Sequence, residues 1–277
     1  MDVFSVSSLE EAVSLLNTMK NAAIVAGGTD LLVKKVRNKL SVDSLIDICG
    51  ISMLKEISNE VDCIRIGALT TFATLERELD AHPFCAALRQ AACEMGAPQI
   101  RNRATIGGNI VTGSPAGDGI IALLALDAKI ELISESEKRT VPLYDFFTGP
   151  GKTVIRPDEI LTALIIPNQS GKSCFYKVGK RNALAVAVLS EAIYAEIREG
   201  KFETIRITVG SAAPTPIRAF RTEKFLLANR FNDEAVHESI RLIRDEISPI
   251  DDVRATAAYR REVAGNILRV LLQQLEK

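Results

Sequence analysis

Two glycine-containing segments carry the residues best suited to hold a ligand closely. The first, Gly27-Gly28-Thr29-Asp30, follows the short apolar run 22–26 and precedes a stretch with helical spacing. The second runs from Ala104 to Asp118 and mixes glycine with Thr, Asn, Ser and Asp. Glycine lets a backbone approach a ligand because it has no Cβ, and short polar side chains reach only nearby atoms. We therefore expect the second segment to be a loop that forms one wall of a cofactor pocket.

The first segment has the pattern of a strand, a glycine turn and a helix. Such a turn presents unpaired backbone N–H groups at the start of a helix, where the helix dipole also favours a phosphate. The segment is not a GxGxxG fingerprint and lacks the lysine of a Walker A loop. A plain tight turn explains Gly27-Gly28 equally well, and Asp30 could simply be a favourable charge in the first helical turn.

Residues for metal or acid–base chemistry are scarce. The chain has two histidines and five cysteines, and no two cysteines form a CxxC pair. This argues against an iron–sulfur cluster or zinc site held by this chain alone, and it is typical of reduced, cytosolic thiols. We predict no catalytic residue and no metal ligand. Arg101 and Arg103, just before the second segment, are either solvated or provide charge for an anionic ligand or partner.

The composition is that of an ordinary globular protein. Of 277 residues, 47% are hydrophobic and 25% charged, with a net charge of -1. The balance of charge gives no field to attract nucleic acid or an anionic membrane. No signal peptide and no apolar run long enough for a membrane span are seen, so we expect a cytoplasmic protein.

Hydrophobic periodicity predicts an α+β protein. Short strands are expected around 22–26, 44–48, 64–68, 128–133, 140–143 and 159–167, with helices between them. The polar segment 168–173 is the best candidate for a domain boundary. Beyond it we expect strands at 173–179, 185–198 and 204–210, and then helices at 218–229, 231–247 and 255–276.

Four motifs in order resemble one family. They are Val25-Ala26-Gly27-Gly28-Thr29-Asp30-Leu31, Thr105-Ile106-Gly107-Gly108-Asn109, Ser114-Pro115-Ala116-Gly117-Asp118 and the C-terminal segment 252–264. Together they resemble the FAD-binding medium subunit of molybdenum hydroxylases, the family of xanthine dehydrogenase and carbon monoxide dehydrogenase. The resemblance covers nearly the whole chain.

The resemblance implies a fold. Residues 1–168 would form a PCMH-type FAD-binding domain of two subdomains, about 1–57 and 58–168. Residues 173–277 would form a C-terminal α+β domain with an antiparallel sheet and helices.

The resemblance also implies roles for single residues. The FAD pyrophosphate would be bound mostly by backbone N–H groups of Ile24, Val25, Ala26, Gly27, Gly28, Thr29, Asp30 and Leu31. A second phosphate and ribityl contact would come from Thr105, Ile106, Gly107, Gly108 and Asn109. Asp118 would accept hydrogen bonds from ribityl or adenosine hydroxyls, Leu161 would pack near the adenine or flavin edge, and Lys177 would lie close to the flavin.

Each of these roles has a simpler alternative. Leu161 could be a plain core residue and Lys177 a surface residue. Asp118 could cap a helix starting at Gly119, and 105–109 could be a hairpin or bulge. Position 95 is Met, where the xanthine-oxidising relatives carry an aromatic residue, so flavin stacking at this position would differ.

The implied function is electron transfer through bound FAD within a complex. A small subunit with 2Fe–2S clusters would deliver electrons, and a large molybdopterin subunit would hydroxylate a purine, an N-heterocycle, an aldehyde or CO. NAD+ or another acceptor would receive the electrons. Two alternatives are a stand-alone FAD-dependent oxidoreductase and a non-enzymatic nucleotide-binding module.

Overall fold

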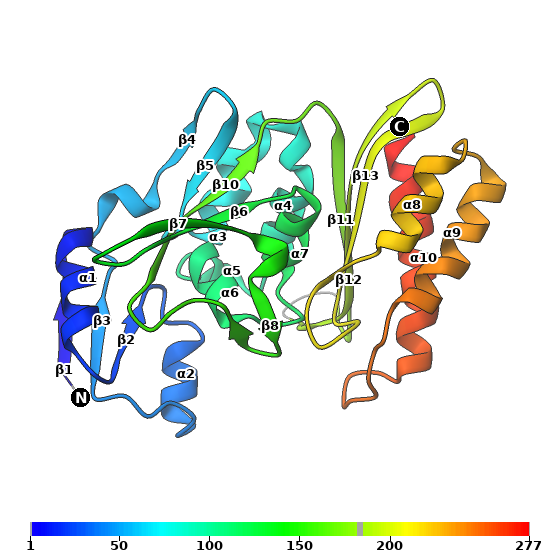
Figure 1. Ribbon diagram of the computed structural model, residues 1–277. Coiled ribbons are helices and arrows are strands. Elements are labelled where there is room, and N and C mark those ends of the chain that lie inside the picture. The colour runs from blue at the N-terminus through cyan, green and yellow to red at the C-terminus, as the bar shows by residue number, and fades with distance from the viewer. Residues whose placement is uncertain (1, 182–184, 277) are drawn as a thin grey trace.

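The computed structural model describes residues 2–181 and 185–276, which form three main sheets that follow one another along the chain and one small two-stranded sheet (Figure 1). The first sheet is parallel, with strand order β1-β3-β2. Its elements are β1 (Asp2–Ser5), α1 (Leu9–Thr18), β2 (Ala22–Val25), α2 (Leu31–Val36) and β3 (Ser44–Asp47). One face of α1 is buried, with Ala12 and Leu16 packed in the same cluster as Ile46 of β3.

The second sheet has five antiparallel strands in the order β4-β5-β10-β6-β7. The strands are β4 (Ile57–Asn59), β5 (Cys63–Gly67), β6 (Lys129–Ile133), β7 (Lys138–Pro142) and β10 (Ile160–Pro167), and a small hairpin adds β8 (Phe147–Gly149) and β9 (Lys152–Thr153). The helices are α3 (Phe72–Glu78), α4 (Ala86–Glu94), α5 (Pro98–Arg101), α6 (Ile106–Thr112) and α7 (Asp118–Ala125). Short 3₁₀ turns are η1 (Ser52–Lys55), η2 (Leu79–Ala81), η3 (Pro83–Cys85) and η4 (Leu143–Asp145).

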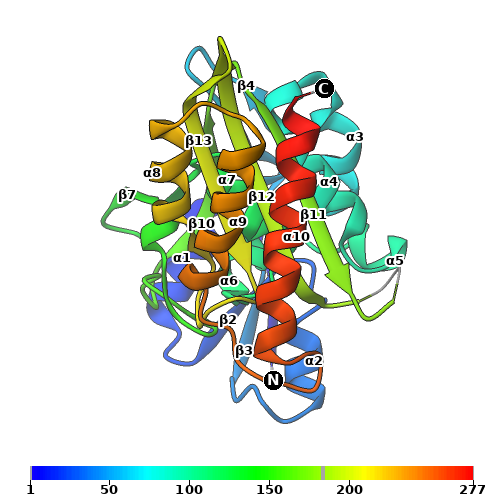
Figure 2. The same ribbon diagram turned by 90° about the vertical axis from the view of Figure 1, so that its right-hand side faces the viewer.

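The third sheet is antiparallel, with order β11-β12-β13-β14. Its strands are β11 (Lys172–Gly179), β12 (Ala187–Arg198), β13 (Lys201–Gly210) and β14 (Ile217–Arg218), followed by α8 (Phe220–Ala228), α9 (Asp233–Glu246) and α10 (Ala257–Leu275). Figure 2 shows α8, α9 and α10 side by side over this sheet. The strands and helices expected in the C-terminal part are confirmed, as is the α+β class.

Both faces of the third sheet are covered, which explains why β12 is apolar along most of its length. Ala192 and Tyr194 belong to the core that contains α4 and α7, whereas Leu189 and Ile193 belong to the core under α10. Side chains alternate between the faces of a strand, so one strand contributes to two cores. The third sheet is therefore firmly attached to the helices of the second unit, by which we mean the second sheet with helices α3 to α7.

The expectation of a loop from Ala104 to Asp118 is wrong for half of the segment. Residues 106–112 form α6, whose N-cap Thr105 accepts a hydrogen bond from the Gly108 N–H. Ile106 and Ile110 lie one turn apart and are fully buried, so burial outweighs the low helix propensity of the glycines. Gly113 ends the helix with φ 62, a left-handed conformation that favours glycine.

Candidate cofactor-binding site

The two glycine segments lie side by side in the structure. A Cβ at Gly27 would stand only 1.9 Å from the carbonyl oxygen of Arg103, so only glycine fits between the two backbones. Beyond this contact, the Thr112 hydroxyl donates to the Asp30 carboxylate at 3.3 Å. The turn after β2 is thereby held against α6, and the first sheet meets the second unit at this place.

The turn between β2 and α2 presents a row of unused backbone donors. Gly28 has φ +72, which turns the chain sharply between the strand and the helix. Across residues 2–181 and 185–276, no acceptor takes a hydrogen bond from the N–H groups of Gly27 to Leu31. Successive free N–H groups in such a turn make a concave site for an anion such as a phosphate. This arrangement supports a diphosphate site more strongly than the sequence pattern did.

The start of α6 offers fewer backbone donors than its glycines suggest. The N–H groups of Ile106 and Gly107 donate to the carbonyls of Thr70 and Ala68, both at 2.9 Å. A Cβ at Gly107 would lie 2.7 Å from the Cβ of Ala68, so this glycine is required for packing. At Gly108, which is exposed, a Cβ would approach only the Thr105 hydroxyl, at 2.9 Å. Of Gly107 and Gly108, only Gly108 is therefore open to the approach of a ligand.

Lys177 and Asp118 form a buried ion pair. The Lys177 ammonium lies 2.6 Å from the Asp118 carboxylate and also donates to the carbonyl of Glu94 at 2.9 Å. The two side chains are only 6% and 8% exposed, so the surface alternative for Lys177 is wrong. Burial raises the pKa of Asp118 to about 6, although the charge of Lys177 acts in the opposite direction. Asp118 is the first residue of α7 and its side chain makes no capping hydrogen bond, so the capping alternative is also wrong.

Two buried oxygens in this region lack a partner. They are Oδ1 of Asn109 and Oδ1 of Asp118, neither of which accepts a hydrogen bond from any residue that the structure describes. Buried polar atoms are normally satisfied, so such atoms point to a missing donor. FAD carries a diphosphate for the free N–H groups and ribityl and ribose hydroxyls for these oxygens, so the residues present fit the cofactor.

Leu161 and Met95 contribute to the core next to this region. Leu161 lies on the central strand β10 and is 5% exposed within the core of the second unit, as the simpler alternative expected. Met95 is half-buried and packs against the same core. A contact of Leu161 with the adenine or flavin edge stays a prediction.

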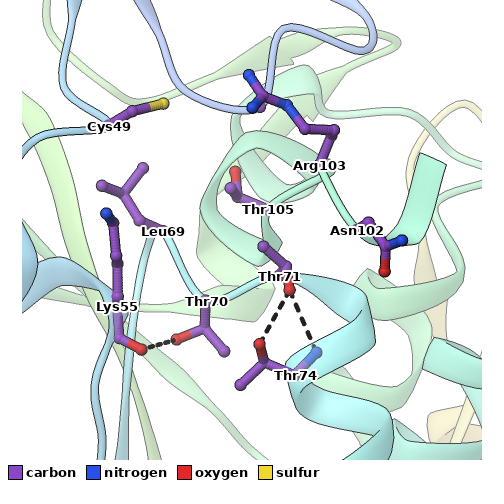
Figure 3. Close-up of a pocket in the computed structure, with 10 residues that line it drawn as sticks. Cys49, Lys55, Leu69, Thr70, Thr71, Thr74, Asn102, Arg103 and Thr105 are labelled. Carbon is purple, nitrogen blue, oxygen red and sulfur yellow. Dashed lines mark hydrogen bonds between the residues drawn. The ribbon is translucent and has the colours of Figure 1, made fainter. Parts of the chain in front are cut away.

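A cavity of about 280 Å³ opens where the first sheet meets the second unit (Figure 3). It is lined by Gly27, Cys49, Lys55, Leu69, Thr70, Thr71, Thr74, Asn102, Arg103 and Thr105. Only Gly27 and Thr105 were predicted as site residues. The other residues come from three separate stretches of the chain, at positions 49–55, 69–74 and 102–103, and no motif in the sequence links these stretches. Burial raises the pKa of the Cys49 thiol, with Asp47 adding to the effect.

Comparison with known proteins identifies the class. Residues 1–169 match the family model described as the FAD binding domain in molybdopterin dehydrogenase, and residues 174–275 match the CO dehydrogenase flavoprotein C-terminal domain. The fold and its donor-lined turn are thus those of a flavoprotein.

The relatives match this chain over nearly its full length. The chain is 34% identical to the nicotinate dehydrogenase FAD-subunit of Eubacterium barkeri, over 99% of this chain and 97% of the relative. It is 31% identical to a xanthine dehydrogenase FAD-binding subunit of Escherichia coli, over 97% and 93%. A solved carbon monoxide dehydrogenase structure from Hydrogenophaga pseudoflava superposes with a TM-score of 0.92 at 30% identity, covering 100% of this chain and 97% of that chain.

The chain belongs to the FAD-binding subunits of molybdenum hydroxylase-type dehydrogenases. It is an oxidoreductase subunit and its cofactor is FAD. No helix in the described ranges is both long and apolar enough to cross a membrane.

Proposed function

We propose that this chain passes electrons from the iron–sulfur clusters of a small 2Fe–2S subunit to NAD+ or another acceptor. The large partner would be a molybdopterin subunit that hydroxylates a purine, an N-heterocycle, an aldehyde or CO. The observation that carries the proposal is the full-length likeness to the FAD subunits of dehydrogenases that act on nicotinate and xanthine, together with the fit of the turn and the unpartnered oxygens to FAD. We further propose a cytoplasmic location.

The residues of this chain would bind and orient the cofactor. The N–H groups of Gly27 to Leu31 would bind its diphosphate. Ile24 to Ala26, at the end of β2, lead the chain into this turn and would complete the diphosphate-binding segment. Gly108 and Asn109 of α6 would face the phosphate and ribityl groups from the opposite side. Asp118 would accept a cofactor hydroxyl on Oδ1 while Lys177 holds Oδ2.

The bound FAD supplies the redox chemistry, because a flavin exchanges single electrons with clusters and a hydride with nicotinamide. The protein contributes position and electrostatics. The buried Lys177 ammonium is balanced by the Asp118 carboxylate 2.6 Å away, so the pair fixes the position of Asp118 and adds no net charge beside the site. No side chain of this chain is assigned an acid–base role in our proposal.

We also propose separate roles for the N-terminal and C-terminal parts of the chain. Residues 1–168, as two subdomains of about 1–57 and 58–168, would clasp FAD. Residues 173–277 would close the site from the side of β11, which carries Lys177. The ranges of the two family models, 1–169 and 174–275, support this division.

The function is tested by isolating the chain alone and within its complex. We expect a yellow chain that releases FAD, and a flavin in the complex that is reduced by the hydroxylation substrate. The same substrate should leave the flavin of the isolated chain oxidised. Reduction of the isolated flavin by the substrate would instead show a stand-alone oxidoreductase, and a colourless chain that cannot be reconstituted would contradict both.

The acceptor is tested separately. Anaerobic addition of NADH to the FAD-loaded complex, without other substrate, should bleach the flavin absorbance if NAD+ is the physiological acceptor. A flavin that stays oxidised would exclude NAD+ and direct the search to other acceptors.

A further inference from the structure

Ser211, the residue that follows β13, has a strained backbone. Its φ is 59, a left-handed conformation that residues other than glycine rarely adopt. Its N–H donates to the carbonyl of Pro115 at 2.8 Å, and its hydroxyl donates to the carbonyl of Ala187 at 3.2 Å. Strained residues persist only where their surroundings hold them, and they cluster at functional sites. Ser211 therefore needs a partner that holds its conformation, and its N–H in turn holds the segment before α7.

The partner is Arg260 of α10, which is only 2% exposed. Its guanidinium donates to the carbonyl of Ser211 at 2.9 Å and to the carboxylate of Asp252 at 2.6 Å. Its Nε is buried without an acceptor in the ranges 2–181 and 185–276. Replacing a buried ion pair by apolar residues is often neutral or stabilising, so stability alone is a weak reason for this arginine. The position that it gives to Ser211 is a better one.

The third sheet holds α7 along its whole length. Ser211 binds the segment that leads into the helix, as described above. Further along, the Thr208 hydroxyl donates to the carbonyl of Ile121 at 2.8 Å. Near the end of the helix, Nε of Arg206 donates to the carbonyl of Ala125 at 2.7 Å. The position of α7, and of the carboxylate at its first residue, is therefore set by β13 and the residue that follows it.

We propose that Arg260 is a positioning residue for the FAD site. By holding Ser211 in its left-handed conformation, it sets the position of the segment before α7 and hence of Asp118. The inference rests on the proposed contact between Oδ1 of Asp118 and a cofactor hydroxyl. Lys177 fixes the other carboxylate oxygen, whereas the backbone is fixed through two successive hydrogen bonds, from Arg260 to Ser211 and from Ser211 to Pro115. Arg260 acts through Ser211 and needs no contact of its own with FAD.

Titration of FAD into the FAD-depleted full chain, followed by flavin fluorescence, measures the effect. Arg260→Met should raise the Kd for FAD about tenfold, as expected when one hydrogen bond to the cofactor is lost. The matched control is Arg261→Met. Arg261 is half-buried on the same turn of α10 and donates to the carbonyls of Arg244 and Ile247, at 3.1 and 2.6 Å, instead of that of Ser211. Its loss should lower the melting temperature and leave the Kd for FAD unchanged.

Two further comparisons show whether Arg260 acts through Ser211 and Asp118. Glycine adopts a positive φ without strain, so adding Ser211→Gly to Arg260→Met should restore most of the affinity for FAD. Ser211→Gly alone should bind FAD as the original chain does, because it keeps the N–H that donates to Pro115. A chain with Lys177→Met and Asp118→Ala lacks both the acceptor oxygen and its counter-charge. In that chain Arg260→Met should change the Kd by no more than about twofold, since the group that it positions is absent.

The proposal is overturned if Arg260→Met leaves the Kd for FAD unchanged, or if Arg261→Met raises it equally. It is also overturned if Ser211→Gly restores no affinity, or if Arg260→Met still weakens binding about tenfold without the Asp118 carboxylate. Should Arg260→Met not fold, Arg260→Lys replaces it in every comparison, because lysine keeps a cation beside Asp252 but lacks the planar fork of arginine. An original chain that binds no FAD would contradict the proposed function instead.

Discussion

Lys177 of β11 and Asp118 of α7 are joined by a buried ion pair with 2.6 Å between Nζ and Oδ2, although they lie 59 residues apart in the chain. The pair connects the C-terminal sheet to the second unit, which contains the second glycine segment. It also leaves Oδ1 of Asp118 without a partner in the described part of the chain. Under our proposal that Asp118 accepts a cofactor hydroxyl, the C-terminal sheet would contribute to the cofactor site through Lys177.

Removing the lysine should destabilise the protein. Lys177→Met leaves a buried carboxylate without its counter-charge, and we expect the free energy of unfolding to fall by about 3–5 kcal/mol. The double variant Lys177→Met with Asp118→Asn should recover part of this loss because no charge is left buried. Guanidinium denaturation of all four proteins measures the coupling, and additive effects would contradict a direct interaction.

FAD binding should weaken at low pH. The pKa of Asp118 is raised from 3.8 to about 6 by burial, so its carboxyl group takes up a proton as the pH falls through 6. A cofactor hydroxyl that donates to Oδ1 favours the ionised form, so the affinity for FAD should be highest above pH 6 and decrease below it. Fluorescence titration with FAD between pH 5 and 8 measures this. Asp118→Asn should show a flat profile, and an unchanged profile in that variant would assign the effect to another group.

The two glycines of α6 should respond differently to substitution. Gly107→Ala places a methyl group against Ala68, and overpacking of this kind costs about 1–3 kcal/mol of stability. Gly108→Val needs only a small shift of the Thr105 hydroxyl, so the fold should persist while the branched side chain occupies the place of the cofactor. Melting temperature and flavin content, measured on both variants, separate the effects. Normal flavin content in Gly108→Val would refute the placement of FAD against this helix.

Glu191 on β12 should make stability depend on pH. Its carboxyl group is completely buried without a hydrogen bond from any described residue, and burial raises its pKa well above 4.5. In the unfolded chain the group ionises near its ordinary pKa, so folding is favoured below that pH and stability is lost as the pH rises above it. The loss can reach about 1.4 kcal/mol per pH unit for one proton.

Glu191→Gln should therefore stabilise the protein by an amount that grows between pH 5 and 8. Urea denaturation at several pH values measures the difference from the original chain. Glu203→Gln, on the exposed part of β13, serves as the matched control and should follow the original chain at every pH. Parallel stability curves for Glu191→Gln and the original chain would show that the buried carboxyl group is not the titrating one.

Much of the fold could be predicted because it depends on local patterns. The alternation of 204–210 predicts a strand, and the structure has β13 there; the periodicity of 255–276 predicts a helix, and α10 fills it. The segment 104–118 shows where local reasoning fails. Its small residues predict close approach of a ligand, but Gly107 packs against Ala68 instead, and burial of Ile106 and Ile110 against distant residues makes residues 106–112 a helix.

The sequence by itself determined the α+β class, the family and the cofactor. The class follows from hydrophobic periodicity, and the family and cofactor follow from motifs of adjacent residues. Only the tertiary structure decided which groups are free to act. In the folded chain Arg101 pairs with Glu76, whereas Arg103 faces a cavity that Lys55 also lines. The first N–H groups of α6 donate to the carbonyls of Ala68 and Thr70, whereas the N–H groups of the turn after β2 stay unused in the described part of the chain. The physical reason is that a hydrogen bond or ion pair depends on distance in space, and partners far apart in the chain leave no mark in local composition.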